Sequence, residues 1–117
     1  MADESKTLNK KGTLGSVRIA DEVVSIIAGL AATEVSGIEG MSGGLVGGIA
    51  EMLGRKNFAK GVKVEVGEKE AAVDLYIIVK YGVRIPDVAL SVQENVKQAI
   101  ETMTGLSVVE VNVHVQG

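Results

Sequence analysis

Cysteine is absent from the 117 residues, so the chain offers no disulfide, no thiolate nucleophile and no cysteine-ligated metal site. Tryptophan is also missing, and an aromatic content of 3% leaves few side chains on which nucleic-acid bases could stack. The formal net charge of −3 at pH 7 disfavours attraction to phosphate backbones. Cysteine redox chemistry is therefore excluded, and nucleic acid is a poor candidate ligand.

Long hydrophobic runs are lacking as well, because none approaches the roughly 20 residues that a transmembrane helix needs. The stretch from Met1 to Lys6 is charged and leads into no hydrophobic signal core. We therefore expect a cytoplasmic protein that would reach a membrane only through a partner. The hydrophobic content of 46% is enough for one domain of this size to fold unaided. Residues 1–12 are interpreted as a flexible charged tail and residues 13–117 as a single domain.

Two segments have helical periodicity. The first begins where Asp21 and Glu22 place negative charge at the positive end of the helix dipole, and it stops at Ser36–Gly37. The second begins at Pro86 and closes at Gly105. The predicted core faces are Val23, Val24, Ile27, Leu30 and Ala31 for the first helix, and Val88, Val92, Val96, Ala99 and Met103 for the second.

Strand periodicity is clearest in Val62–Val66 and Val73–Val79, which are predicted to form a hairpin, and in Val109–Val115, which should pair with it. Ser16–Ile19 and Ile38–Met41 are predicted as short extended pieces, whereas glycine-rich Gly40–Gly54 is predicted as a mobile loop with a short, weak helix. The fold class predicted is therefore α+β: a two-layer sandwich, largely antiparallel, of three or more strands with two long helices on one face.

Six sequence blocks carry a family resemblance in a fixed order: Ile19–Val24 with Ala28–Met41, Gly48–Asn57, Lys60–Val66, Ile85–Val88, Gln93–Lys97 and Val109–Gly117. They resemble the alkaline shock protein 23 family, which includes the Gls general stress proteins and is found mainly in Gram-positive bacteria. Each block alone is only apolar periodicity with glycine, but together they cover nearly everything after the tail. Members of this family have no known catalytic residues or cofactor.

The resemblance implies a non-enzymatic adaptor, scaffold or regulatory protein that acts through protein–protein contacts in the cell-envelope stress response or in lipid synthesis. Implied partners are a membrane-anchor protein or a fatty-acid-synthesis enzyme such as acetyl-CoA carboxylase. A homo-oligomer is a further expectation, because two helices on one side leave the other sheet face uncovered. The family branch stays open at this point.

Candidate contact residues lie on the polar phase of the strands. Tyr76 and Ile78, with Val108 opening the same phase of the last strand, are predicted to form an apolar protein-contact patch, unless the glycine-rich segment folds over it. Arg55, Lys56, Lys60 and Lys63 form a basic cluster for an anionic partner, which supports the alternative of a nucleic-acid-binding regulator.

Other motifs are weak. His114, the only histidine, is expected to face solvent beside Glu110 and Asn112, and a paired acid and base from Glu65, Asp74 and Glu110 is disfavoured because all three alternate with core positions. The run Gly43–Gly48 lacks the Gly-Lys-Ser/Thr ending of a phosphate loop, and its Gly-x-x-Gly has apolar rather than basic middle residues.

Overall fold

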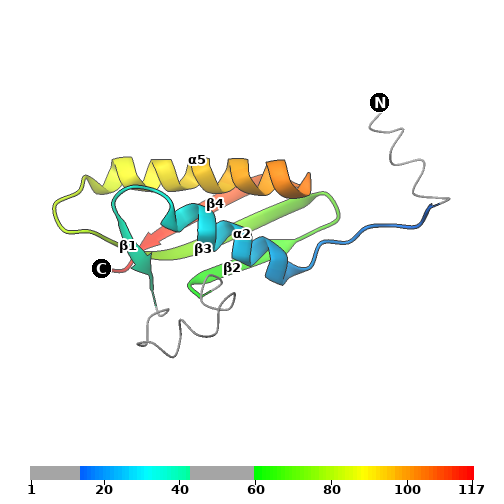
Figure 1. Ribbon diagram of the computed structural model, residues 1–117, viewed down its shortest axis with the longest axis horizontal. Helices are drawn as coiled ribbons and strands as arrows, with labels where there is room; N and C mark the ends of the chain where they lie inside the picture. The colour runs from blue at the N-terminus through cyan, green and yellow to red at the C-terminus, as the bar shows by residue number, and fades with distance from the viewer. Residues whose placement is uncertain (1–13, 43–59) are drawn as a thin grey trace.

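Two helices pack on one side of a four-stranded sheet in the computed structural model, which describes residues 14–42 and 60–117 (Figure 1). The elements are α2 (Asp21–Thr33), β1 (Ile38–Met41), β2 (Val62–Val66), β3 (Glu70–Val79), α5 (Ile85–Thr104) and β4 (Ser107–Val115). The predicted tail, the boundary after residue 12 and most of the Gly40–Gly54 segment lie outside the described residues.

Strand β3 is the centre of the sheet. β1 and β2 both pair with it in antiparallel fashion along one edge, β1 opposite Ile77–Val79 and β2 opposite Ala71–Leu75. β4 pairs along the other edge and runs parallel to β3, with α5 as the crossover connection. The predicted two-layer α+β sandwich is confirmed, and β4 is the parallel member of an otherwise antiparallel set.

The core lies between the helices and alternate residues of β3. Leu75 and Ile77 are fully buried, and a buried aliphatic side chain of this size stabilises a fold by about 1.5–3 kcal/mol. The helical contributions are Val24, Ile27, Ala28, Ala31 and Ala32 from α2, and Val88, Val92, Val96 and Ile100 from α5.

Three predicted core residues are on the surface instead. Val23 is 46% exposed, Leu30 39% and Met103 69%. In α5 the buried positions follow a four-residue step that ends on Ile100, so Met103 falls outside the packed stripe. In α2 the small side chains of Ala28 and Ala32 occupy the buried positions that larger residues were expected to fill.

The ends of α5 follow its sequence signals. Pro86 occupies the first turn, and Gly105 ends the helix in the left-handed conformation (φ 78°) while its N–H donates to Glu101 O. By contrast, α2 ends at Thr33 rather than at Ser36–Gly37, and Gly37 belongs to the connection that leads into β1. Ser16–Ile19, predicted as a short extended piece, is not part of the sheet: these residues have no regular secondary structure, and no described strand pairs with them.

Candidate functional site

The sheet face opposite the helices is the site of interest and is called the outer face below. Lys63 and Glu65 come from β2, and Asp74, Tyr76 and Ile78 from β3, because alternate strand residues point to the same side. The register arranges these side chains in rows across the sheet. From the β2–β3 turn toward the end of β3, the rows are Glu65–Ala72–Glu110, Lys63–Asp74–Asn112, Tyr76–His114 and Gly40–Ile78.

The third row carries an aromatic pair. The rings of Tyr76 and His114 stack with their centroids 4.4 Å apart and their planes 11° from parallel. Lys63 Nζ lies 5.5 Å from the centroid of the Tyr76 ring, a cation–π distance, and His114 Nε2 is 3.2 Å from Asp74 Oδ1. Three strands therefore converge on one cluster of four side chains, which is called the aromatic cluster: Lys63, Asp74, Tyr76 and His114.

Val108 does not join Tyr76 and Ile78 on the outer face, contrary to the predicted patch. A β-bulge shifts the pairing, since Val108 is opposite Ala71 whereas Glu110 is opposite Ala72. The bulge turns Val108 toward the helices, where its side chain is 4% exposed and belongs to the core. The residues beyond it, Glu110, Asn112 and His114, are set on the outer face.

Tyr76 and Ile78 are half-buried neighbours on the outer face, where the sequence placed them. Their role as protein contacts stays a prediction. The basic cluster is only partly described: Lys60 is exposed, Lys63 contacts Tyr76, and Arg55 and Lys56 lie outside the described residues, as does Gly43–Gly48. Its role with an anionic partner also stays a prediction.

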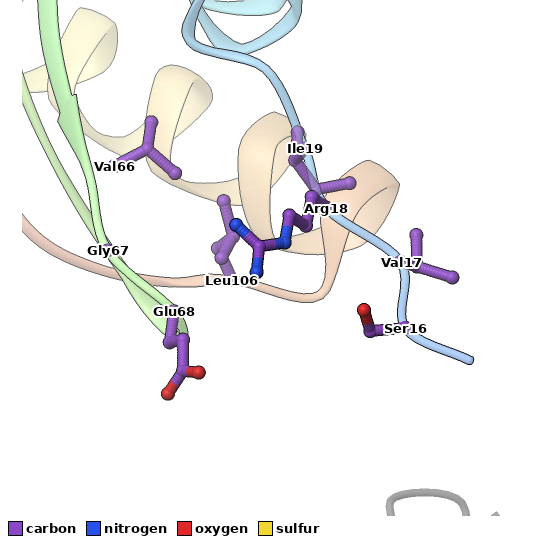
Figure 2. A pocket seen from close by; sticks show the side chains of 8 residues that line it. All are labelled: Ser16, Val17, Arg18, Ile19, Val66, Gly67, Glu68 and Leu106. Carbon is purple, nitrogen blue, oxygen red and sulfur yellow. The ribbon is translucent and has the colours of Figure 1, made fainter. Parts of the chain in front are cut away.

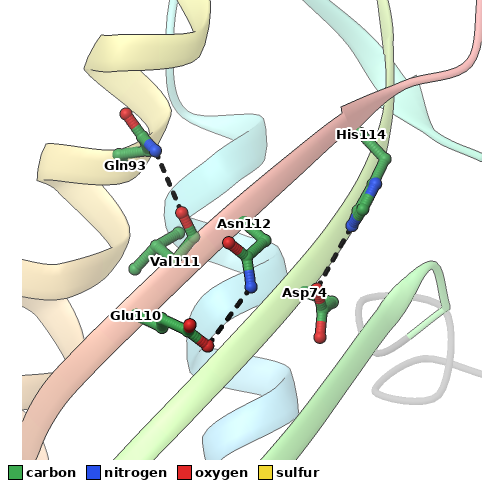
Figure 3. A network of polar contacts seen from close by, with 6 residues as sticks. All are labelled: Asp74, Gln93, Glu110, Val111, Asn112 and His114. Carbon is green, nitrogen blue, oxygen red and sulfur yellow. Dashed lines mark hydrogen bonds and ion pairs between the residues drawn. The ribbon is translucent and has the colours of Figure 1, made fainter.

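His114 is half-exposed rather than freely solvated, with 41% of its side chain accessible beside an Asp74 side chain at 40% (Figure 3). Asn112 Nδ2 donates to Glu110 Oε1 at 3.4 Å on the same strand (Figure 3). When His114 is protonated, its contact with Asp74 is an ion pair. Glu65, Asp74 and Glu110 lie on the solvated face, as expected, and within the described residues no group of three His, Asp or Glu side chains is placed to hold a metal ion.

A hollow at the other end of the sheet lies between residues 16–19 and the β2–β3 turn (Figure 2). Leu106 and Val66 form its apolar side. Figure 2 shows the Arg18 side chain reaching into this space while the Glu68 carboxylate points away from it. The two charges therefore do not converge on a common point, and the hollow does not assemble an acid–base pair.

The sequence is similar to known proteins, and this similarity identifies its family. The model of the alkaline shock protein 23 family, described as having a cell envelope-related function, matches residues 9–117. The chain belongs to this family. Neither helix that the structure describes is long and apolar enough to cross a membrane. No solved structure gives a significant match.

Several bacterial proteins share this alkaline shock protein domain. The chain is 47% identical to uncharacterized protein YqhY of Bacillus subtilis over 104 residues, which cover 89% of this chain and 77% of YqhY. It is 40% identical to uncharacterized protein YloU of the same organism, covering 88% of each chain. It is 37% identical to a protein named stress response regulator gls24 homolog from Streptococcus pyogenes, covering 86% of this chain and 57% of that protein. The family thus places the chain among envelope- and stress-related proteins.

Proposed function

We propose that this member of the alkaline shock protein 23 family is a non-catalytic adaptor that binds a segment of an envelope-associated protein on its outer face. The observation that carries the proposal is the aromatic cluster, in which side chains from β2, β3 and β4 meet on the sheet face that the helices do not cover. Aromatic side chains are enriched at protein interfaces because they offer rigid apolar area with polar edges.

The outer face changes character along the strands. Its first row holds two carboxylates, Glu65 and Glu110, on either side of Ala72, whereas its last rows hold Tyr76 and Ile78. Rows are two residues apart, so Ala72 and Ile78 are separated by about 20 Å along β3. A ligand lying along β3 would meet acidic groups at one end and apolar and aromatic groups at the other.

This order of chemistry favours a partner segment with basic residues followed by apolar ones. Segments of that kind border transmembrane helices on the cytoplasmic side, where Lys and Arg are in excess. A membrane-anchor protein is therefore the partner that we favour over a fatty-acid-synthesis enzyme. The face carries carboxylates in two of its rows, which disfavours a nucleic-acid backbone there.

Photo-crosslinking in bacterial cells tests the proposal. A photoreactive phenylalanine derivative is placed at Tyr76, which keeps an aromatic ring on the outer face, and the matched control carries it at Met103, an exposed apolar position on α5. Mass spectrometry of the crosslinked peptides should identify a basic, membrane-flanking segment for the Tyr76 variant and not for the Met103 variant. Ile78→Asp should abolish that crosslink, while Met103→Asp should leave it intact.

Other products would contradict the proposal in distinct ways. Crosslinks from position 76 mainly to RNA or DNA would support the nucleic-acid-binding alternative. Crosslinks to a subunit of acetyl-CoA carboxylase would keep the adaptor but move it to lipid synthesis. Equal crosslinking from positions 76 and 103, unaffected by Ile78→Asp, would remove the outer face as a specific binding site.

A further inference from the structure

Strand β4 has a second edge, on the side away from β3, which is distinct from the outer face. β4 has nine residues and pairs only with β3 among the described elements, so its other edge is unpaired there. Gln116 N–H donates to Ile77 O, and backbone groups of a strand alternate between its two edges. The N–H and C=O groups of Val111, Val113 and Val115 therefore point away from β3.

Two side chains of α5 already occupy the first part of this edge. Glu101 Oε2 accepts from Val108 N–H at 2.9 Å. Gln93 Nε2 donates to Val111 O at 3.0 Å, a contact that is drawn in Figure 3. Capping of this kind, together with the bulge, protects an edge strand from indiscriminate pairing. It leaves the second half of β4, from the N–H of Val111 to Val115, as the part that can accept another strand.

We infer that β4 of a second copy adds to this edge in antiparallel orientation, with the two-fold axis at Asn112. In that register Val111 of one protomer is opposite Val113 of its partner, and both direct their backbone groups outward. The pair would exchange two hydrogen bonds, because a carbonyl has a second lone pair that Gln93 leaves free. The two-fold axis repeats the same pair, so the contact is self-complementary and closed.

Charge selects this register among those that the backbone allows. Residues directly opposite each other in antiparallel strands project to the same face, so Glu110 of one protomer stands opposite His114 of its partner on the outer face. The contact with Asp74 and the stack on Tyr76 already fix the position of His114. A shift of two residues in either direction places Glu110 opposite Asn112 or Gln116 instead and loses both pairs of acid with imidazole.

Helix α5 supplies an apolar flank to the same edge. Gln93, which caps Val111, and Leu90 lie one turn apart on the helix and so share a side. Leu90 is 54% exposed, and Val115 at the end of β4 is 36% exposed. Joining two protomers at β4 would bring the α5 helices of both protomers to the two-fold axis and shield these side chains from water. A partner that offered only an extended peptide would leave them exposed.

The absence of native cysteine makes a crosslinking test clean. At the two-fold axis, opposed residues of a non-hydrogen-bonded pair have Cα atoms about 4.5 Å apart, within the range of a disulfide. Asn112→Cys should therefore form a disulfide-linked dimer under mild oxidation. The matched control, Glu65→Cys, is also exposed on the outer face but belongs to β2, and should stay a monomer on a non-reducing gel.

Light scattering after size-exclusion chromatography completes the test. The unmodified protein should have twice the chain mass, and Glu110→Arg should halve that mass by placing a cation opposite His114 of the partner subunit. A monomeric unmodified protein would overturn the inference, as would a dimer that crosslinks through Glu65→Cys and not through Asn112→Cys. These readouts measure self-association alone, so they can fail while partner binding at the outer face succeeds, and the reverse also holds.

Discussion

The ring of Tyr76 stacks on the ring of His114 across the only parallel strand pair of the described sheet, with 4.4 Å between the ring centroids. The two residues are direct register partners on β3 and β4. Their contact joins the hairpin to the strand that arrives after α5, so it links segments that the sequence keeps far apart. The stack is also the only place on the outer face where an imidazole is held by both an aromatic ring and a carboxylate among the described residues.

The stack should be measurable as a coupling between the two residues. Tyr76→Leu and His114→Ala should each lower the free energy of unfolding, and the double variant should lose less than the sum of the two. A favourable aromatic pair contributes about 0.5–1.5 kcal/mol beyond buried area, so we expect a coupling energy near the lower end because the site is half-exposed. Urea denaturation of the four proteins gives this value, and strict additivity would contradict the prediction.

Gly61 and Gly105 provide a matched pair for backbone strain. Both are left-handed, with φ of 76° and 78°. An added Cβ at Gly61 would lie 2.9 Å from Ser42 O and 3.0 Å from Tyr76 O. At Gly105, apart from the adjoining residues and the helix's own last turn, no atom of the described residues would lie within 4 Å of an added Cβ. Gly105→Ala should cost about 1 kcal/mol from strain alone. Gly61→Ala should cost at least about 1 kcal/mol more, since backbone atoms cannot give way easily. Equal thermal stabilities for the two variants would be inconsistent with this close approach.

Asn95 ties the two helices together. Its Nδ2 donates to Ala31 O at 2.7 Å. Ala31 lies in the last turn of α2, where the backbone carbonyls have no N–H donor within their own helix. Asn95→Ala should lower the free energy of unfolding by about 1–2 kcal/mol because a buried carbonyl loses its donor. Gln98→Ala, at an exposed position of the same helix, should change it by less than about 0.5 kcal/mol. Chemical denaturation distinguishes the two outcomes, and similar losses would contradict the capping role.

Leu75 and Met103 separate core from surface. Leu75 is fully buried in the middle of β3, so Leu75→Ala should destabilise the protein by about 2–5 kcal/mol. Met103→Ala, which the sequence pattern alone would rank as a core change, should have an effect below about 0.5 kcal/mol because its side chain is 69% exposed. A large loss at Met103 would show that another surface covers it.

Local patterns accounted for most of the secondary structure. The valine alternation predicted β2, β3 and β4, and Pro86 with Gly105 marked α5 within a residue of its ends. The orientation of β4 could not be derived in this way, since a strand that follows a long helix can return in either direction. Ser16–Ile19 shows the opposite limit: an alternating pattern becomes a strand only where a neighbour accepts its hydrogen bonds.

The candidate site could be predicted only in part, because a local pattern indicates the face of a strand and not its pairing with other strands. Tyr76 and Ile78 alternate regularly with buried neighbours, so their face followed from sequence. Val108 was assigned to the wrong face because a single bulge reverses the alternation, and a bulge leaves no clear signal in a valine-rich strand. The Tyr76–His114 stack depended on that register, and no local pattern could have paired the two.

The backbone of Tyr76 forms hydrogen bonds with both Ser42 and Gly61, two residues that are far apart in the sequence. Its C=O accepts from Ser42 N–H at 2.8 Å, and its N–H donates to Gly61 O at 2.8 Å, so the polypeptide departs from and returns to the same residue of β3. Adding residues to a loop whose two ends are fixed together increases the entropy cost of closing it only slightly. Ser42 and Gly61 are therefore both fixed at one residue of the aromatic cluster, and a change in the length of the chain between them should leave the register of the strands intact.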